Sequence, residues 1–204
     1  MSAATRTPDD RFAGAALIGA SLLSVAAMAH HPAGTGQPLL AQIVHAAMIA
    51  FVLVAFAGFI RLSARLGLER FSNLAALIVY GAGACASGLA ATLNGFVALQ
   101  LAGASADVRH FSWELNQALA YGAVYAASIA FLLWSANLVR TTGLSRIVGV
   151  VGLAAGVSLP ALLLTGALGM NVAGAFVVYA VQAAFGVFAG ALLMRSSSFR
   201  SDNA

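Results

Sequence analysis

The sequence lacks lysine, contains one cysteine and has few charged side chains of any kind. Charged residues make up 8% of the 204 residues, whereas a soluble globular domain carries roughly 25%. So few charges cannot cover a folded core in water, and the mean hydropathy of +0.93 agrees with this. The composition therefore excludes soluble, disordered and collagen-like classes and indicates an integral membrane protein.

The scarcity of cysteine and of sequence motifs removes several functions. Cys85 stands alone in an apolar run, so the sequence excludes an internal disulfide, a CxxC zinc or redox site and covalent haem attachment through CxxCH. There is also no P-loop, no Rossmann fingerprint and no GxSxG elbow. Ten arginines give a formal charge of +4, but they form no basic cluster with aromatics, which argues against a nucleic-acid partner. Whether the protein is an enzyme stays open.

Six apolar stretches are long enough to cross a bilayer, which takes about 20 residues of helix. We therefore predict an all-α six-transmembrane-helix bundle in contact with the lipid bilayer, with one domain over residues 12–194 and tails at 1–11 and 195–204. The predicted spans are Phe12–Ala29, Leu39–Ile60, Leu74–Leu101, Phe111–Val139, Ile147–Thr165 and Met170–Met194.

The arginines predict the orientation of the bundle. With six spans, nine of the ten arginines fall on one side of the membrane and only Arg109 falls on the other. Because cytoplasmic segments are enriched in Lys and Arg, both termini are predicted to be cytoplasmic. Abundant Ala and Gly with Arg in place of Lys is typical of GC-rich bacterial genomes, so we predict a bacterial inner membrane.

The first span has an alternative interpretation as a cleaved signal peptide. Arg11, an apolar run and Ala27-Met28-Ala29 imitate the charged region, the apolar region and the cleavage site of such a peptide. The run is longer than usual, and Asp9 and Asp10 dilute the positive charge. These features favour a retained first span, whereas cleavage would leave five.

Polar side chains gather at the predicted outer ends of the spans. All four histidines (His30, His31, His45 and His110) lie there, together with Glu114, the only acid within an apolar span. Ionisable side chains inside a membrane are costly and usually functional. Their common level predicts an outward-facing polar pocket, which Gln42, Asn94, Gln117, Tyr121 and Asn171 complete.

The fourth span carries the clearest polar pattern. Its polar residues recur at steps of three and four, which places them on one face of a helix within about 80°. Lipid cannot satisfy such a face, so we predict that it points into the bundle or into a wet cavity. Its members are His110, Glu114, Gln117, Tyr121, Tyr125, Ser128 and Ser135.

Three functions fit this polar pocket. In the first, a metal ion is bound by His45, His110 and Glu114 with His30 or His31, because imidazole suits Zn, Cu and Fe and a carboxylate completes a zinc set. A haem would instead need His45 and His110 facing each other. In the second, these groups gate a small proton- or cation-coupled transporter or channel. In the third, they are internal hydrogen bonds of a structural or accessory protein. A homo-oligomer or a partner membrane subunit is compatible with all three.

Small residues predict where the helices touch. Gly152 and Gly156 in the fifth span, and Gly186 and Gly190 in the sixth, form GxxxG patterns. In membranes such patterns let two helix backbones approach closely, so we interpret them as helix–helix seams.

Overall fold

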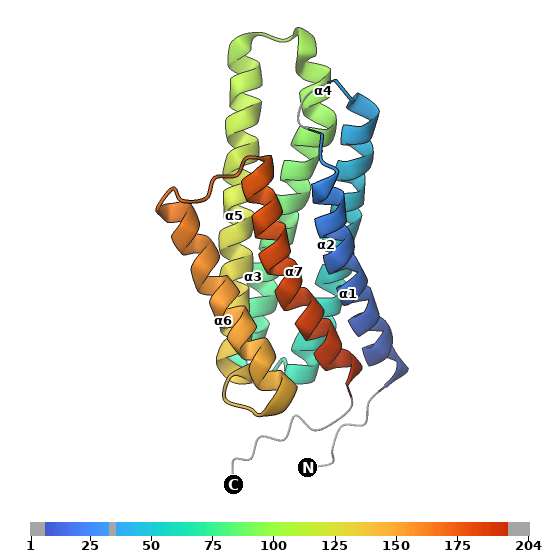
Figure 1. Cartoon of the computed structure of the whole chain (residues 1–204), viewed down its shortest axis with the longest axis vertical. Coiled ribbons are helices and arrows are strands. Elements are labelled where there is room, and N and C mark those ends of the chain that lie inside the picture. Colours follow the sequence, from blue (N-terminus) through green and yellow to red (C-terminus); the bar gives the residue numbers. More distant parts are fainter. Residues whose placement is uncertain (1–6, 33–35, 196–204) are drawn as a thin grey trace.

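The computed structural model describes residues 7–32 and 36–195, and every element within these ranges is a helix (Figure 1). Arg6 and Arg200, as well as the outermost parts of both predicted tails, lie outside the described residues. The helices are α1 (Pro8–Ala29), α2 (Pro38–Leu66), α3 (Phe71–Thr92), η1 (Leu93–Val97), α4 (Ala98–Gln100), η2 (Leu101–Gly103), α5 (Ala106–Leu138), α6 (Gly143–Leu164) and α7 (Val172–Met194).

Six of these helical segments are long and apolar enough to span a membrane, which confirms the predicted spans. The third span is continuous from Phe71 to Gly103 because η1, α4 and η2 extend α3 without a break. Several helices are longer than the apolar stretches predicted from the sequence. α1 begins at Pro8 rather than Phe12, since Thr7 and Asp10 form a capping box there.

The six spans form a closed ring. Each packs against its neighbours in the chain, and α1 also packs against α7, so the first and last helices lie side by side (Figure 1). Both described termini therefore lie at the same end of the bundle. The span formed by α3 to η2 and its partner α5 reach farthest at the opposite end. At about 1.5 Å per residue these two spans are about 50 Å long, which exceeds a hydrocarbon core of about 30 Å.

Glycines make the close seams of the ring. A Cβ atom on Gly190 would come within 2.6 Å of the Gly14 carbonyl oxygen, and one on Gly14 within 2.5 Å of the Gly190 carbonyl oxygen. Likewise, the Gly152 and Gly156 backbone lies against Ser135, Ser128 and Leu132 of α5. Both GxxxG patterns are thus helix–helix seams, as predicted.

An aromatic core fills the half of the ring nearest the termini. Phe59 stacks on Trp134 with ring centroids 4.9 Å apart, and Phe131 lies 4.3 Å from Phe185. Tyr80 also packs against this cluster, with its ring centroid 4.6 Å from that of Phe59. The Trp134 indole nitrogen donates a hydrogen bond to the Ser63 hydroxyl, so the polar edge of this buried ring is satisfied.

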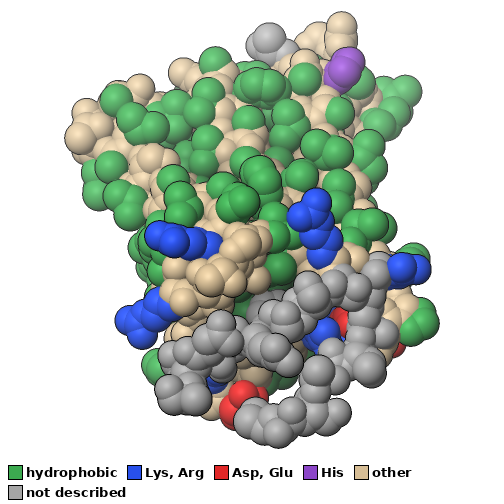
Figure 2. All heavy atoms as spheres, turned by 60° about the horizontal axis from the view of Figure 1, so that its bottom comes forward, with side chains coloured by type: hydrophobic (Ala, Val, Ile, Leu, Met, Phe, Trp, Pro, Cys, Tyr) green, Lys and Arg blue, Asp and Glu red, His purple; other side chains and the backbone are tan. Residues whose placement is uncertain are grey.

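Arginines surround the end of the bundle that carries the termini (Figure 2). Because successive spans alternate in direction, the described arginines other than Arg109 all lie at this end, which we call the arginine end. The opposite end, which carries His30, His31, His45 and His110, is called the histidine end. Figure 2 also shows hydrophobic side chains over much of the surface between the two ends. The arginine-end residues are Arg11, Arg61, Arg65, Arg70, Arg140, Arg146 and Arg195.

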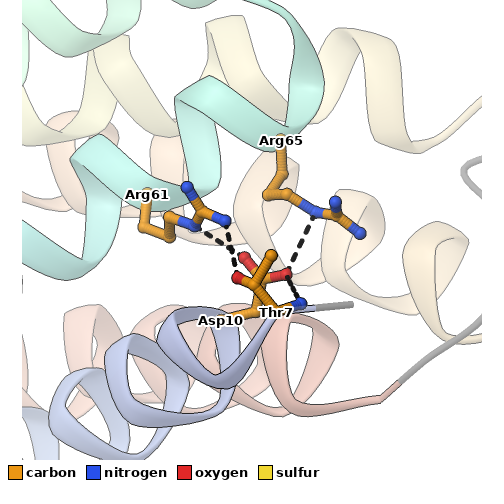
Figure 3. A network of polar contacts seen from close by, with 4 residues as sticks. All are labelled: Thr7, Asp10, Arg61 and Arg65. Atoms are coloured by element: carbon orange, nitrogen blue, oxygen red, sulfur yellow. Dashed lines mark hydrogen bonds and ion pairs between the residues drawn. The ribbon is translucent and has the colours of Figure 1, made fainter. Parts of the chain in front are cut away.

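A buried ion pair ties α1 to α2 at the arginine end (Figure 3). Asp10 is 1% exposed, and its Oδ1 atom accepts a hydrogen bond from Arg61 Nε at 2.6 Å. Its Oδ2 atom lies 3.7 Å from Arg65 Nε and accepts the Thr7 backbone N–H at 3.0 Å. The carboxylate therefore compensates two arginines and caps α1 at the same time.

Candidate functional site

A cavity of about 500 Å³ lies within the ring toward the histidine end. Helices α2, α3, α5 and α7 contribute most of its walls, and the segment after α1 also reaches it. Tyr80 borders the cavity from one side and the aromatic core from the other. The cavity thus ends where the aromatic core begins.

A π-helical segment shapes the cavity wall on the third span. Residues Leu93–Val97 form this wider turn, and Asn94 within it lines the cavity. A Cβ atom on Gly95 would lie 2.5 Å from the Cβ atom of His45, so only glycine lets the π turn press against that histidine. π turns inside α-helices are frequent at functional sites.

Two histidines face each other in the cavity lining. His45 comes from the second turn of α2, and His31 comes from the segment that follows α1. Their Nε2 atoms are 3.2 Å apart, with the ring centroids at 4.8 Å and the planes at 75°. His45 is 4% exposed. The chain therefore brings together two of the histidines that the sequence placed at this level.

The hydrogen bonds of the other ring nitrogens define the protonation of this pair. His45 Nδ1 lies 2.7 Å from the Ala41 carbonyl oxygen, and His31 Nδ1 lies 3.0 Å from that of Pro32. A carbonyl oxygen only accepts, so both Nδ1 atoms must carry the hydrogen. In the neutral rings both Nε2 atoms then carry lone pairs that face each other at 3.2 Å, and either one proton shared between the two nitrogens or a bound metal ion satisfies both lone pairs.

Burial favours the neutral form of His31. Loss of hydration lowers the pKa of this ring below its ordinary value, and the hydrogen bond to Pro32 opposes the shift only in part. Near neutral pH the ring is therefore uncharged, and its Nε2 lone pair is available to a ligand.

The remaining predicted ligands lie elsewhere. The His110 and Glu114 side chains are 73% and 60% exposed, and His110 Nε2 lies 3.9 Å from Glu114 Oε1 on α5. His30 is exposed and bonds the Ala26 carbonyl oxygen. Among the described residues, no three His, Cys, Asp or Glu side chains come together as a metal-binding group. The predicted His/Glu set is therefore not gathered: Glu114 lies between Trp113 and Asn116, which line the cavity, but its own exposed side chain does not line it, and neither does that of His110.

The predicted polar pocket is gathered in part. Asn94, Gln117 and Asn171 line the cavity, whereas Gln42 and Tyr121 do not. Tyr121 packs instead against a small apolar cluster that contains Val124 and Leu159.

The polar face of α5 divides along its length. Gln117 lines the cavity, but the buried Ser128 and Ser135 lie where α6 approaches closely through Gly156 and Gly152. Neither serine hydroxyl has a hydrogen-bond partner within the described ranges. The half of this face nearer the arginine end is therefore a packed helix seam. The polar face does not form a continuous path across the membrane, which argues against the transport hypothesis.

Sequence reasoning missed Asn116 and the deeper polar residues of the cavity. Asn116, Tyr179 and Gln182 all line it. Asn116 lies beside the polar face of α5 rather than on it. The available signal was a row of small residues one turn apart on α5, namely Ala120, Ala123 and Ala127, which continues from Asn116 and forms the cavity wall.

Comparison with known proteins adds no function to this geometry. No protein-family model matches the chain, and no curated protein or solved structure matches it.

Proposed function

We propose that this six-span membrane protein binds a transition-metal ion through His31 and His45. The observation that supports this is the pair of Nε2 atoms at 3.2 Å, with both Nδ1 atoms committed to backbone carbonyl oxygens. Histidines that ligate metals commonly donate the other ring N–H to a carbonyl oxygen in this way, which fixes the tautomer and the ring orientation.

The spacing of the pair suits neighbouring ligands of one tetrahedral ion. Two nitrogens at 2.0–2.1 Å from such an ion lie about 3.3 Å apart, close to the separation of 3.2 Å between the two rings. Axial ligands of a haem lie on opposite faces of the iron and are farther apart. His110, the other histidine that the haem hypothesis needs, does not line the cavity. The geometry therefore favours a bare ion over a haem.

Copper(I) fits the surroundings better than zinc does. Met28 and Met48 line the same cavity and pack in one cluster, and thioethers together with imidazoles select copper(I). Among the residues that the structure describes, those that line the cavity include no carboxylate. Without a negative charge nearby, a monovalent ion is easier to bury than a divalent one.

Metal titration of the purified protein tests this function. We expect one copper(I) per chain, measured under anaerobic conditions against a colorimetric chelator. His31→Ala and His45→Ala should each weaken binding at least a hundredfold, because either change removes one of two strong ligands. Met48→Leu should weaken copper(I) binding and leave zinc binding unchanged.

His30→Ala and His110→Ala are the matched controls, since both side chains are exposed and lie outside the cavity. They should bind copper(I) like the parent protein. Equal binding by His31→Ala and the parent, or no binding by the parent, would contradict the proposal. Tighter binding of zinc than of copper(I) would contradict the choice of metal.

We also propose that the cavity faces away from the cytoplasm of a bacterial inner membrane. The arginine end supports this orientation through the positive-inside rule. Alkaline phosphatase fused after residue 105 should be active, and fusions after residues 65 and 143 should be inactive. The reverse pattern would place the cavity on the cytoplasmic side.

A further inference from the structure

The side chain of Asn116 is buried without a partner. It is 6% exposed and lines the main cavity as well as a second cavity of about 200 Å³ beside it. Its amide makes no hydrogen bond with any residue that the structure describes. A buried amide that lacks a partner is costly, so such groups are normally satisfied by protein, water or a ligand. The Asn116 amide atoms are not among the fully enclosed polar atoms that lack a partner, so the amide opens into the cavity, where its donors and acceptor can meet a bound molecule.

Further neutral amides surround this position. Asn94 lines both cavities with Asn116, and Gln117 and Asn171 line the main one. The Asn171 Oδ1 atom accepts the Gly174 backbone N–H at 2.9 Å, which leaves the Asn171 NH₂ group to donate elsewhere. The described residues that line the main cavity include no arginine, aspartate or glutamate. A ligand bound there would meet hydrogen-bonding groups of both kinds and no formal charge.

Deeper in the cavity, small apolar residues of α3 and α5 form one side of the wall, and α7 contributes Tyr179 and Gln182. Gly83, Ala84, Ala120, Ala123 and Ala127 line this part between α3 and α5. Along α5 the lining runs from Trp113 to Ala127, a length of about 20 Å at 1.5 Å per residue. The cavity therefore combines an amide-rich end with an elongated slot of small apolar residues.

We propose that this cavity binds an uncharged amphiphile. Its polar head hydrogen-bonds to Asn116 and the neighbouring amides, and its apolar body lies in the slot between α3 and α5. In the metal-free protein an anionic head is disfavoured, because the described residues that line the main cavity include no arginine to compensate its charge. The evidence is separate from the histidine pair, so this inference stands without the metal.

Binding of 2-acetylnaphthalene to the purified full-length protein tests the inference, with 2-naphthoate as the charged probe of the same ring. Trp113 lines both cavities, whereas Trp134 is buried in the aromatic core. The neutral ketone should quench Trp113 fluorescence saturably and raise the melting temperature, and the carboxylate should do neither. Asn116→Leu should weaken binding of the ketone about tenfold, the loss expected for one buried hydrogen bond.

The same variant separates a ligand-binding role from a structural one. Because it removes an amide without a partner, Asn116→Leu should melt at or above the temperature of the parent protein. Ala120→Leu should block the slot, whereas Ala118→Leu, two residues away on the exposed face, should bind like the parent. His30→Ala, whose exposed side chain lies outside the cavity, should also keep full binding of the ketone.

Three results would overturn the inference. Equal affinity of Asn116→Leu and the parent would show that the amide holds water only. A lower melting temperature of the unliganded Asn116→Leu variant would show that the amide is part of the fold. Equal affinity of Ala118→Leu and Ala120→Leu would place the probe outside the cavity.

Discussion

Replacing Gly190 by alanine is expected to destabilise the bundle by about 1–3 kcal/mol, the usual cost of forcing an extra group into a packed contact. The new methyl group would stand 2.6 Å from the Gly14 carbonyl oxygen and 2.7 Å from the side chain of Ile18. The first contact is with backbone, which cannot rotate away, so α1 and α7 must separate along their seam. The melting temperature of the purified protein measures this loss.

Gly19→Ala is the matched control on α1. A Cβ atom there meets nothing within 4 Å, so this variant should gain up to about 1 kcal/mol from the better helix propensity of alanine. The double variant Gly14→Ala/Gly190→Ala should lose less than the sum of the two single changes, because the first change already opens the shared seam. Losses that simply add would contradict a direct contact between the two glycines.

Replacing Asp10 by alanine should cost about 3 kcal/mol, the lower end for breaking a buried ion pair. The change leaves Arg61 without the carboxylate oxygen that lies 2.6 Å from its Nε atom, and it removes the cap on the Thr7 N–H. The lower end of the range applies because the Arg61 side chain is 32% exposed and regains some hydration. Thermal unfolding in detergent reports this loss.

Asp9→Ala controls for the charge near the start of α1. Asp9 is exposed beside the buried Asp10, so it acts only through the helix dipole and should cost less than about 1 kcal/mol. Asp10→Asn keeps an oxygen for the cap but loses the charge. Its loss of stability should therefore fall between those of Asp9→Ala and Asp10→Ala. Equal losses for Asp9→Ala and Asp10→Ala would mean that the ion pair does not hold α1 to α2.

The six spans were predictable because the thickness of a bilayer sets the length of an apolar run. The alternation of arginines also depends on chain order alone. The neighbours of each helix were not predictable in the same way, because several spans carry small residues that would allow close packing. The contact between Gly14 and Gly190, for example, joins the first helix to the last, and the GxxxG pattern of the sixth span predicts a seam there without indicating which helix packs against it.

The candidate site, too, was predictable in part. The common level of His31 and His45 followed from their positions near the ends of spans, and the structure brings them to 3.2 Å. His110 and Glu114 share that end, but their exposed side chains do not line the cavity, although Trp113 and Asn116 beside Glu114 on α5 do. Asn116 was not predicted, because the cavity face of α5 was inferred from its polar residues. That face consists mainly of small side chains.

The pairing of α1 with α7 has a consequence for the order of assembly. These two helices are the most distant in sequence, so their seam forms only after the last span has been synthesised and inserted. Until then, the face of α1 that carries Gly14 is covered by lipid or by a transient partner, and the cavity lacks the wall that α7 supplies. The cavity wall is therefore complete only after the final span, which begins at Val172, has packed against α1.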